Sequence, residues 1–62
     1  MDIAAKVEKI RQITVRMYQL ADAAVERDAP AEELEKLYRR AHAAYRKLAA
    51  ARIEARALGV EA

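Results

Sequence analysis

The sequence predicts an all-α protein: an antiparallel two-helix hairpin that assembles into a homo-oligomeric helical bundle, with a C2 four-helix bundle as the expected form. Apolar residues recur at steps of three and four along two long segments. The only proline, Pro30, separates these segments, and the only glycine, Gly59, follows the second. With 62 residues the chain is a single domain (1–62), and a chain of this size has marginal stability on its own.

The first helix is expected over residues 2–27, the turn over 28–30 and the second helix over 30–58. Pro30 disfavours the helical conformation at the residue before it, so the first helix should end there. Proline is also well tolerated in the first turn of a helix, so the second helix should begin at this point.

Two further residues are expected to cap the second helix. Asp28 can accept a backbone N–H at its start. At its end Gly59 suits the position after the last helical turn, and Val60 would then contact Ala55, as in a Schellman motif.

One apolar stripe on each segment predicts the seam between the two helices. The stripe of the second segment follows a strict heptad pattern. Antiparallel pairing sets large residues opposite small ones, except for a bulky layer of Ile10 and Leu48. Thr14 interrupts the first stripe, and its hydroxyl can bond to the carbonyl one turn back. The expected intrachain core comprises Ile3, Val7, Ile10, Met17, Leu34, Leu37, Ala41, Ala44, Leu48, Ala51 and Leu58.

Both segments carry more apolar surface than this seam uses, and a hairpin alone would leave the excess in water. Contiguous exposed apolar surface usually marks a contact site, so a second copy is the expected partner. The expected oligomer interface comprises Tyr38, His42, Tyr45, Ala49, Ile53, Ile13 and Leu20. Val15 and Tyr18 lie outside both stripes and leave a further neighbour open.

The amino-acid composition excludes several classes of function. Hydrophobic residues make up 55% of the chain, but 16 of them are alanines that bury little area each. The chain has no cysteine, which excludes disulfides and thiolate metal sites, and no serine or asparagine, so it lacks common nucleophiles and amide donors. We therefore expect no enzyme activity and no cofactor.

The net charge of +2 and the absence of a long apolar run predict a soluble protein without a membrane span. The N-terminal residues lack the features of a targeting signal, and a cytoplasmic location is expected if the chain is expressed in a cell.

His42 is the only histidine and invites two functional interpretations. A metal site would need more ligands than one histidine and the distant Glu35 supply, and Arg39 and Arg46 would repel a cation. A catalytic site would need a carboxylate or nucleophile within one turn of His42, which the sequence does not provide. Packing against another helix accounts for His42 and its neighbouring tyrosines better than either.

A basic strip on the second helix raises the possibility of binding to nucleic acid or an anionic membrane. No aromatic residue interleaves it, so a solvated helix face is the favoured interpretation and nucleic acid is the less favoured partner. The strip comprises Lys36, Arg39, Arg40, Arg46 and Lys47.

The segments PAEELEKLYRRA, which opens a helix, and EARALGVEA, which closes one, agree with the apolar pattern and the charge placement throughout. In this respect the alanine-rich chain resembles de novo designed helical-hairpin homo-oligomers, which implies a scaffold that folds and self-assembles. The hairpin plan and the pair Asp28–Ala29 are also similar to the Rop-type RNA-binding four-helix-bundle dimer. The phenylalanine and asparagine residues of that family's RNA face are absent, so no residue role is carried over.

The expected function is therefore a structural, self-assembling helical scaffold without catalytic activity, most simply a homodimer. The alternatives are a nucleic-acid-binding hairpin dimer that uses the basic strip, and a helical protein-binding module that uses the stripe containing Tyr38 and Tyr45.

Overall fold

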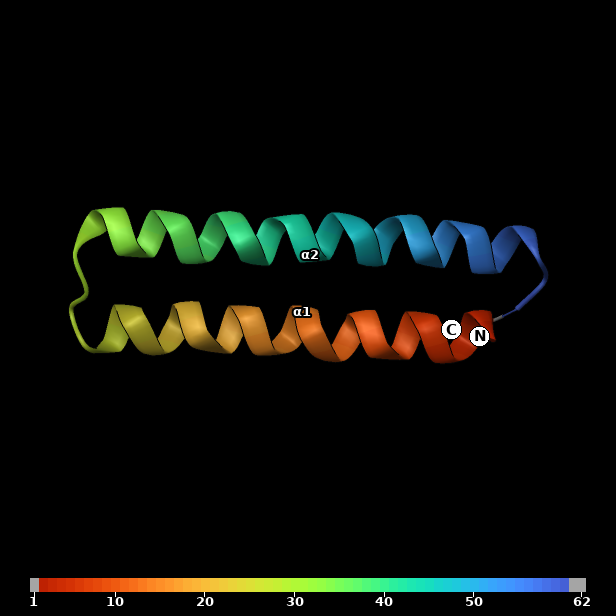
Figure 1. Ribbon diagram of the computed structural model, residues 1–62, viewed down its shortest axis with the longest axis horizontal. Helices are drawn as coiled ribbons and strands as arrows, with labels where there is room; N and C mark the ends of the chain where they lie inside the picture. Colours follow the sequence, from red (N-terminus) through yellow and green to blue (C-terminus); the bar gives the residue numbers. More distant parts are fainter. Residues whose placement is uncertain (1, 61–62) are drawn as a thin grey trace.

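In a computed structural model, which describes residues 2–60, the chain forms two helices side by side (Figure 1). Helix α1 spans Ile3–Glu26 and helix α2 spans Ala31–Ala57, and no described residue belongs to a β-strand. The start of α1 and the end of α2 lie at the same end of the molecule, opposite the turn (Figure 1). The all-helical hairpin is confirmed, and the expected domain 1–62 extends beyond the described residues at both ends.

The two helices have different N-caps. The Asp2 side chain accepts a hydrogen bond from the backbone N–H of Ala4 at 3.4 Å and so caps α1. Pro30 occupies the cap position of α2, without a side-chain hydrogen bond. Glu32 and Glu33 in the first turn of α2 face the positive end of its dipole.

Asp28 has a different role from the predicted one, because it ends α1 instead of capping α2. Its φ angle is 54°, in the left-handed region. The N–H of Ala29 donates to the carbonyl of Ala24 at 3.0 Å, and the N–H of Asp28 donates to the carbonyl of Val25 at 3.1 Å. These two bonds form a Schellman motif with Asp28 at the position that glycine usually takes.

The expected Schellman motif at the end of α2 is confirmed. Gly59 has φ 78°, and its N–H donates to the carbonyl of Arg56 at 3.0 Å. The N–H of Val60 donates to the carbonyl of Ala55 at 2.8 Å. The reversal folds Val60 back onto the apolar cluster formed by Val7, Leu48, Ala51 and Ala55.

This reversal corrects the prediction for Leu58, which is 64% exposed and not a core residue. The helix ends at Ala57, and Leu58 is its C-cap. Val60 packs against the end of the seam, where the pattern had placed Leu58.

Alanine dominates the buried seam. The apolar residues that are buried among the described ones are Val7, Ala21, Ala24, Ala41, Leu48, Ala51 and Ala55. Thr14 is buried beside them, and its hydroxyl donates to the carbonyl of Ile10 at 2.8 Å, as expected. The other predicted core residues are only half-buried: Ile3, Ile10, Met17, Leu34, Leu37 and Ala44.

The hairpin is long and thin, with extents of 43 × 15 × 13 Å. Two antiparallel helices that meet along one stripe have two lateral faces, one on each side of the seam. Side chains next to the seam on one helix meet their counterparts on the other helix across one of these faces. The candidate functional residues are therefore assigned to one lateral face or the other.

Candidate interaction surfaces

Aromatic rings gather on one lateral face, which we call the tyrosine flank. The ring centroids of Tyr18 and His42 are 5.9 Å apart, and those of Tyr38 and His42 are 6.4 Å apart. The Tyr38 hydroxyl donates to Oδ1 of Asp22 at 3.2 Å. The tyrosine flank comprises Tyr18, Val25, Tyr38, His42, Tyr45 and Ala49.

The neighbours of His42 are aromatic rings. It meets rings from both helices, and the aromatic contact with Tyr18 is edge-to-face. Within residues 2–60 no three metal-ligating side chains lie close enough together to hold an ion. The His42 side chain is exposed, and its ring lies against those of Tyr18 and Tyr38.

Tyr38 is held as a neutral hydrogen-bond donor. Partial burial of its ring raises the pKa of its phenol, and the acceptor Asp22 raises it further. The protonated phenol therefore links α2 to α1 across the tyrosine flank.

The sequence pattern left Tyr18 outside both stripes, but it belongs to this flank. Residues adjacent to the seam face each other across an antiparallel hairpin, so Tyr18 on α1 meets the Tyr38–His42 region of α2. Applying this geometry to the sequence would have placed Tyr18 correctly.

Part of the predicted interface stripe remains exposed. Tyr45 is 52% exposed on the tyrosine flank, and Ala49 is half-buried. Ile53 is 68% exposed and points away from the seam, because it lies half a helical turn from the buried residues Ala51 and Ala55. Ile53 thus belongs to the outer surface and not to the flank.

Ile13 and Leu20, assigned to the same interface by the sequence, lie on the opposite lateral face. Ile13 and Met17 line a hollow of about 280 Å³ together with Arg40, Ala43 and Lys47. Leu20 follows Ile13 by seven residues and therefore shares its position on the helix. One contact surface cannot contain both these residues and the tyrosines, which corrects the single predicted interface.

A second hollow of about 250 Å³ continues along this opposite face. It shares Ile10 and Lys47 with the first hollow and extends to Ala50 and to Lys6 and Glu54. The two form one groove, and we call this face the basic flank. It comprises Lys6, Lys9, Ile13, Arg16, Leu20 and Ala23 on α1 with its C-cap Arg27, and Glu33, Lys36, Arg40, Ala43, Lys47, Ala50 and Glu54 on α2.

Ion pairs join the two helices at both ends of the basic flank. Lys6 Nζ lies 3.4 Å from Glu54 Oε2, and Arg27 pairs with Glu33 at 2.7 Å. Arg27 lowers the pKa of the Glu33 carboxyl, and Glu33 raises the pKa of the Arg27 guanidinium. These pairs follow from the antiparallel arrangement and were not predicted from the sequence.

The predicted basic strip is divided by the fold. Arg40 and Lys47 line the groove, whereas Arg39 pairs with Glu35 on its own helix at 2.7 Å. Arg46 lies on the outer surface of α2, half a turn from Leu48. The five residues therefore do not form one continuous cationic surface.

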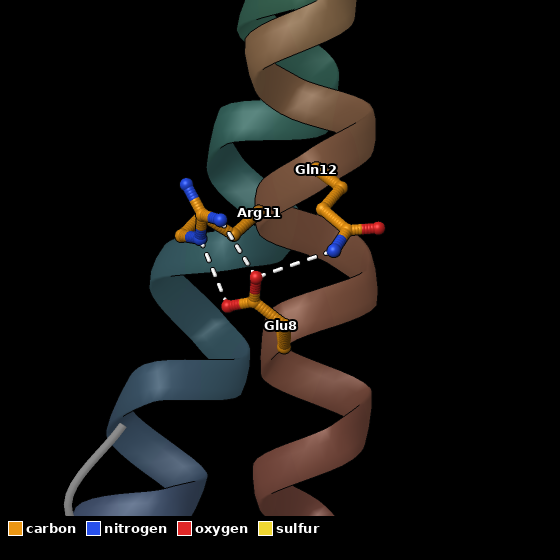
Figure 2. Close-up of polar contacts among 3 residues, drawn as sticks. All are labelled: Glu8, Arg11 and Gln12. Atoms are coloured by element: carbon orange, nitrogen blue, oxygen red, sulfur yellow. Dashed lines mark hydrogen bonds and ion pairs between the residues drawn. The ribbon is translucent and has the colours of Figure 1, made fainter.

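Glu8, Arg11 and Gln12 form a polar cluster on the surface of α1 (Figure 2). Both guanidinium contacts to the Glu8 carboxylate are short, at 2.9 and 2.6 Å, and the Gln12 amide donates at 3.3 Å. The Arg11 hydrogen bonds lower the pKa of Glu8 to about 2. The donors within one turn already satisfy the carboxylate, so this cluster stabilises the helix surface and offers no acid or base.

The fold and these surfaces define an all-helical hairpin with two chemically distinct lateral faces. Comparisons with protein-family models, with curated proteins and with solved structures found no match to this chain. In the described part of the chain, neither helix is long and apolar enough to cross a membrane.

Proposed function

We propose that this protein is a structural, self-associating helical hairpin without catalytic activity, and that copies contact each other through the tyrosine flank. The composition of the seam carries this proposal. Only Val7 and Leu48, among the buried apolar residues described, are larger than alanine. An alanine side chain buries little area, so this seam contributes little hydrophobic free energy to a chain of this size.

The exposed residues of the tyrosine flank provide the large apolar area that the alanine-rich seam lacks. Tyr45 and Val25 are each about half exposed on the tyrosine flank. Tyrosine rings are favoured at interfaces because they bury a large apolar area and keep a polar edge. Covering this flank with a second hairpin would build the core that one chain cannot form.

The charge of the tyrosine flank suits contact between identical surfaces. A twofold axis places each residue near copies of its own neighbours, so a surface with a large excess of one charge would repel itself. Around the tyrosines acids and bases balance: Glu8, Asp22 and Glu35 against Arg11, Arg52 and Arg56. A C2 four-helix bundle through this flank is the simplest assembly, as in the designed hairpin oligomers that the sequence resembles.

Solution mass tests the proposal. Light scattering on a sizing column, over a dilution series, should give a multiple of 7.0 kDa that falls to the monomer mass on dilution. A folded chain that stays monomeric at every concentration would reject self-association.

Two substitutions locate the contact surface. Tyr45→Glu should raise the dissociation constant of the oligomer by tenfold or more, because it introduces a charge into the tyrosine flank, equivalent to at least about 1.4 kcal/mol. Lys47→Glu is the control, since Lys47 lies on the opposite flank. Equal dissociation constants for the two variants would remove the tyrosine flank from the interface.

A further inference from the structure

The basic flank has an apolar groove of its own, which the proposed self-association does not use. Its floor is aliphatic and consists of Ile10, Ile13, Met17, Ala43 and Ala50. Its two hollows, about 280 and 250 Å³, follow one another along the hairpin and do not enclose a single pocket. A groove of successive shallow hollows along a hairpin instead fits the side chains of a third helix.

The charged side chains of the basic flank indicate which kind of partner helix would bind there. The two acids of the basic flank, Glu33 and Glu54, are already bound by Arg27 and Lys6. Five other bases of the flank make no ion pair within residues 2–60. These are Lys9, Arg16, Lys36, Arg40 and Lys47.

The unpaired bases border both sides of the apolar floor. Lys9 and Arg16 each lie one turn from Ile13 on α1. On α2, Arg40 and Lys47 line the groove, and Lys36 lies one turn before Arg40. A partner must therefore carry an apolar stripe between two rows of acids.

We propose that the basic flank is a docking groove for an acidic amphipathic helix of a partner protein. Apolar residues of the partner at positions i, i+3 or i+4, and i+7 would lie on the floor, and its glutamates or aspartates would pair with the five bases. The 43 Å length of the hairpin could accommodate up to about 28 residues of such a helix.

The same observations disfavour a second copy of the chain and a nucleic acid as occupants of the groove. A second copy joined through the same flank would bring five unpaired bases against five more. A nucleic acid would meet an aliphatic floor with no aromatic ring for base stacking. Only an acidic partner with an apolar stripe satisfies both the rows of bases and the floor.

The probe is a synthetic, fluorescein-labelled peptide of three heptads with leucine at a and d and glutamate at e and g. Glutamate at both e and g opposes pairing of the peptide with itself. Fluorescence anisotropy should show saturable binding to the full chain that weakens as salt rises. The same peptide with lysine at e and g should not bind.

Matched variants test each part of the groove. Lys47→Glu should weaken binding by about tenfold or more, while Arg46→Glu, the same charge change on the outer surface, should leave it unchanged. Ile13→Ser should also weaken binding, whereas Ile53→Ser should not. Circular dichroism of each variant verifies that the helices persist.

Several outcomes would overturn the docking proposal. One is that the lysine peptide binds as tightly as the glutamate peptide, and another is that Arg46→Glu costs as much affinity as Lys47→Glu. Tighter binding to polyuridine RNA or to phosphatidylserine vesicles than to the acidic peptide would assign the flank to those partners instead. Because the tyrosine flank is untouched, a failure here leaves the oligomer mass, and hence the proposed self-association, unaffected.

Discussion

Asp28 has a backbone conformation that costs free energy in any residue with a side chain. Its φ of 54° is reached readily by glycine and tolerated by aspartate better than by most other residues. The two hydrogen bonds that follow α1 hold it there, so the turn depends on a strained residue.

Asp28→Gly should therefore stabilise the hairpin by about 0.5–1 kcal/mol in the free energy of unfolding, even though glycine also gains freedom in the unfolded chain. Urea denaturation at a fixed chain concentration measures the difference. Asp28→Ala is the control and should destabilise, because alanine lacks the local hydrogen bonding that lets aspartate adopt this conformation. A loss of stability in Asp28→Gly would show that the aspartate side chain contributes more than its strain costs.

The Glu8 carboxylate is stabilised in its charged form by Arg11 (Figure 2). A folded pKa of about 2, against an ordinary 4.5, means that its contribution is fully present above pH 4.5 and is lost as the pH falls toward 2. The pair is exposed to solvent, so the effect on stability is small and screened by salt.

An NMR titration of the Glu8 side chain should give a pKa near 2, and Arg11→Met should return it toward its ordinary value. An unchanged Glu8 pKa in the Arg11→Met variant would contradict the assigned cause.

At the scale of the helices, Leu48 and Leu58 show that the heptad pattern alone does not decide burial. The sequence pattern gives both a stripe position in the second helix, but Leu48 is in the buried cluster, whereas Leu58 is the C-cap of α2 and is exposed. They differ in burial because α2 ends at Ala57 and the chain then reverses in the Schellman motif at Gly59.

Leu48→Ala should therefore cost about 2–4 kcal/mol of unfolding free energy, as expected for a buried leucine that leaves a cavity. Leu58→Ala should cost less than about 1 kcal/mol. Chemical denaturation of both variants at one chain concentration makes the comparison. Similar costs would contradict the exposed position of Leu58.

The sequence predicts the two helices well because apolar steps of three and four persist for many turns and one proline separates the segments. It predicts the Asp28 turn poorly, because aspartate is favoured both as a helix N-cap and as a left-handed residue at a helix end. Only the path of the chain decides between the two.

The interaction surfaces were predicted in part. Periodicity gives each apolar residue an angle around its own helix, but it does not say which lateral face that residue shares with the other helix. Ile13 and Tyr38 were therefore grouped together although they lie on opposite flanks. The antiparallel pairing of residues adjacent to the seam decides the lateral face, and it also explains the position of Tyr18 and the ion pair Lys6–Glu54.

For the whole molecule, the proposed association links stability to concentration. Subunits that gain part of their core from each other unfold at a temperature that rises with chain concentration, whereas the midpoint of a folded monomer does not change. For a dimer of this length, a tenfold concentration increase should raise Tm by about 5 °C.

Calorimetry over two decades of concentration measures this dependence. Tyr45→Glu is the informative variant, since at each concentration its Tm should be lower than that of the parent chain. A parent Tm that does not vary with concentration would contradict assembly through any surface.

The cluster that contains Val7, Leu48, Ala51 and Ala55 lies at the end of the hairpin away from the turn, with Ile3, Ile10 and Val60 packed around it. Helix ends usually fray first, because they have the fewest partners. In this protein the largest buried side chains stabilise the end of the hairpin away from the turn. The end at the turn has only buried alanines and the strained Asp28. Local opening should therefore begin at the turn, and the two ends of the chain, farthest apart in sequence, should separate last.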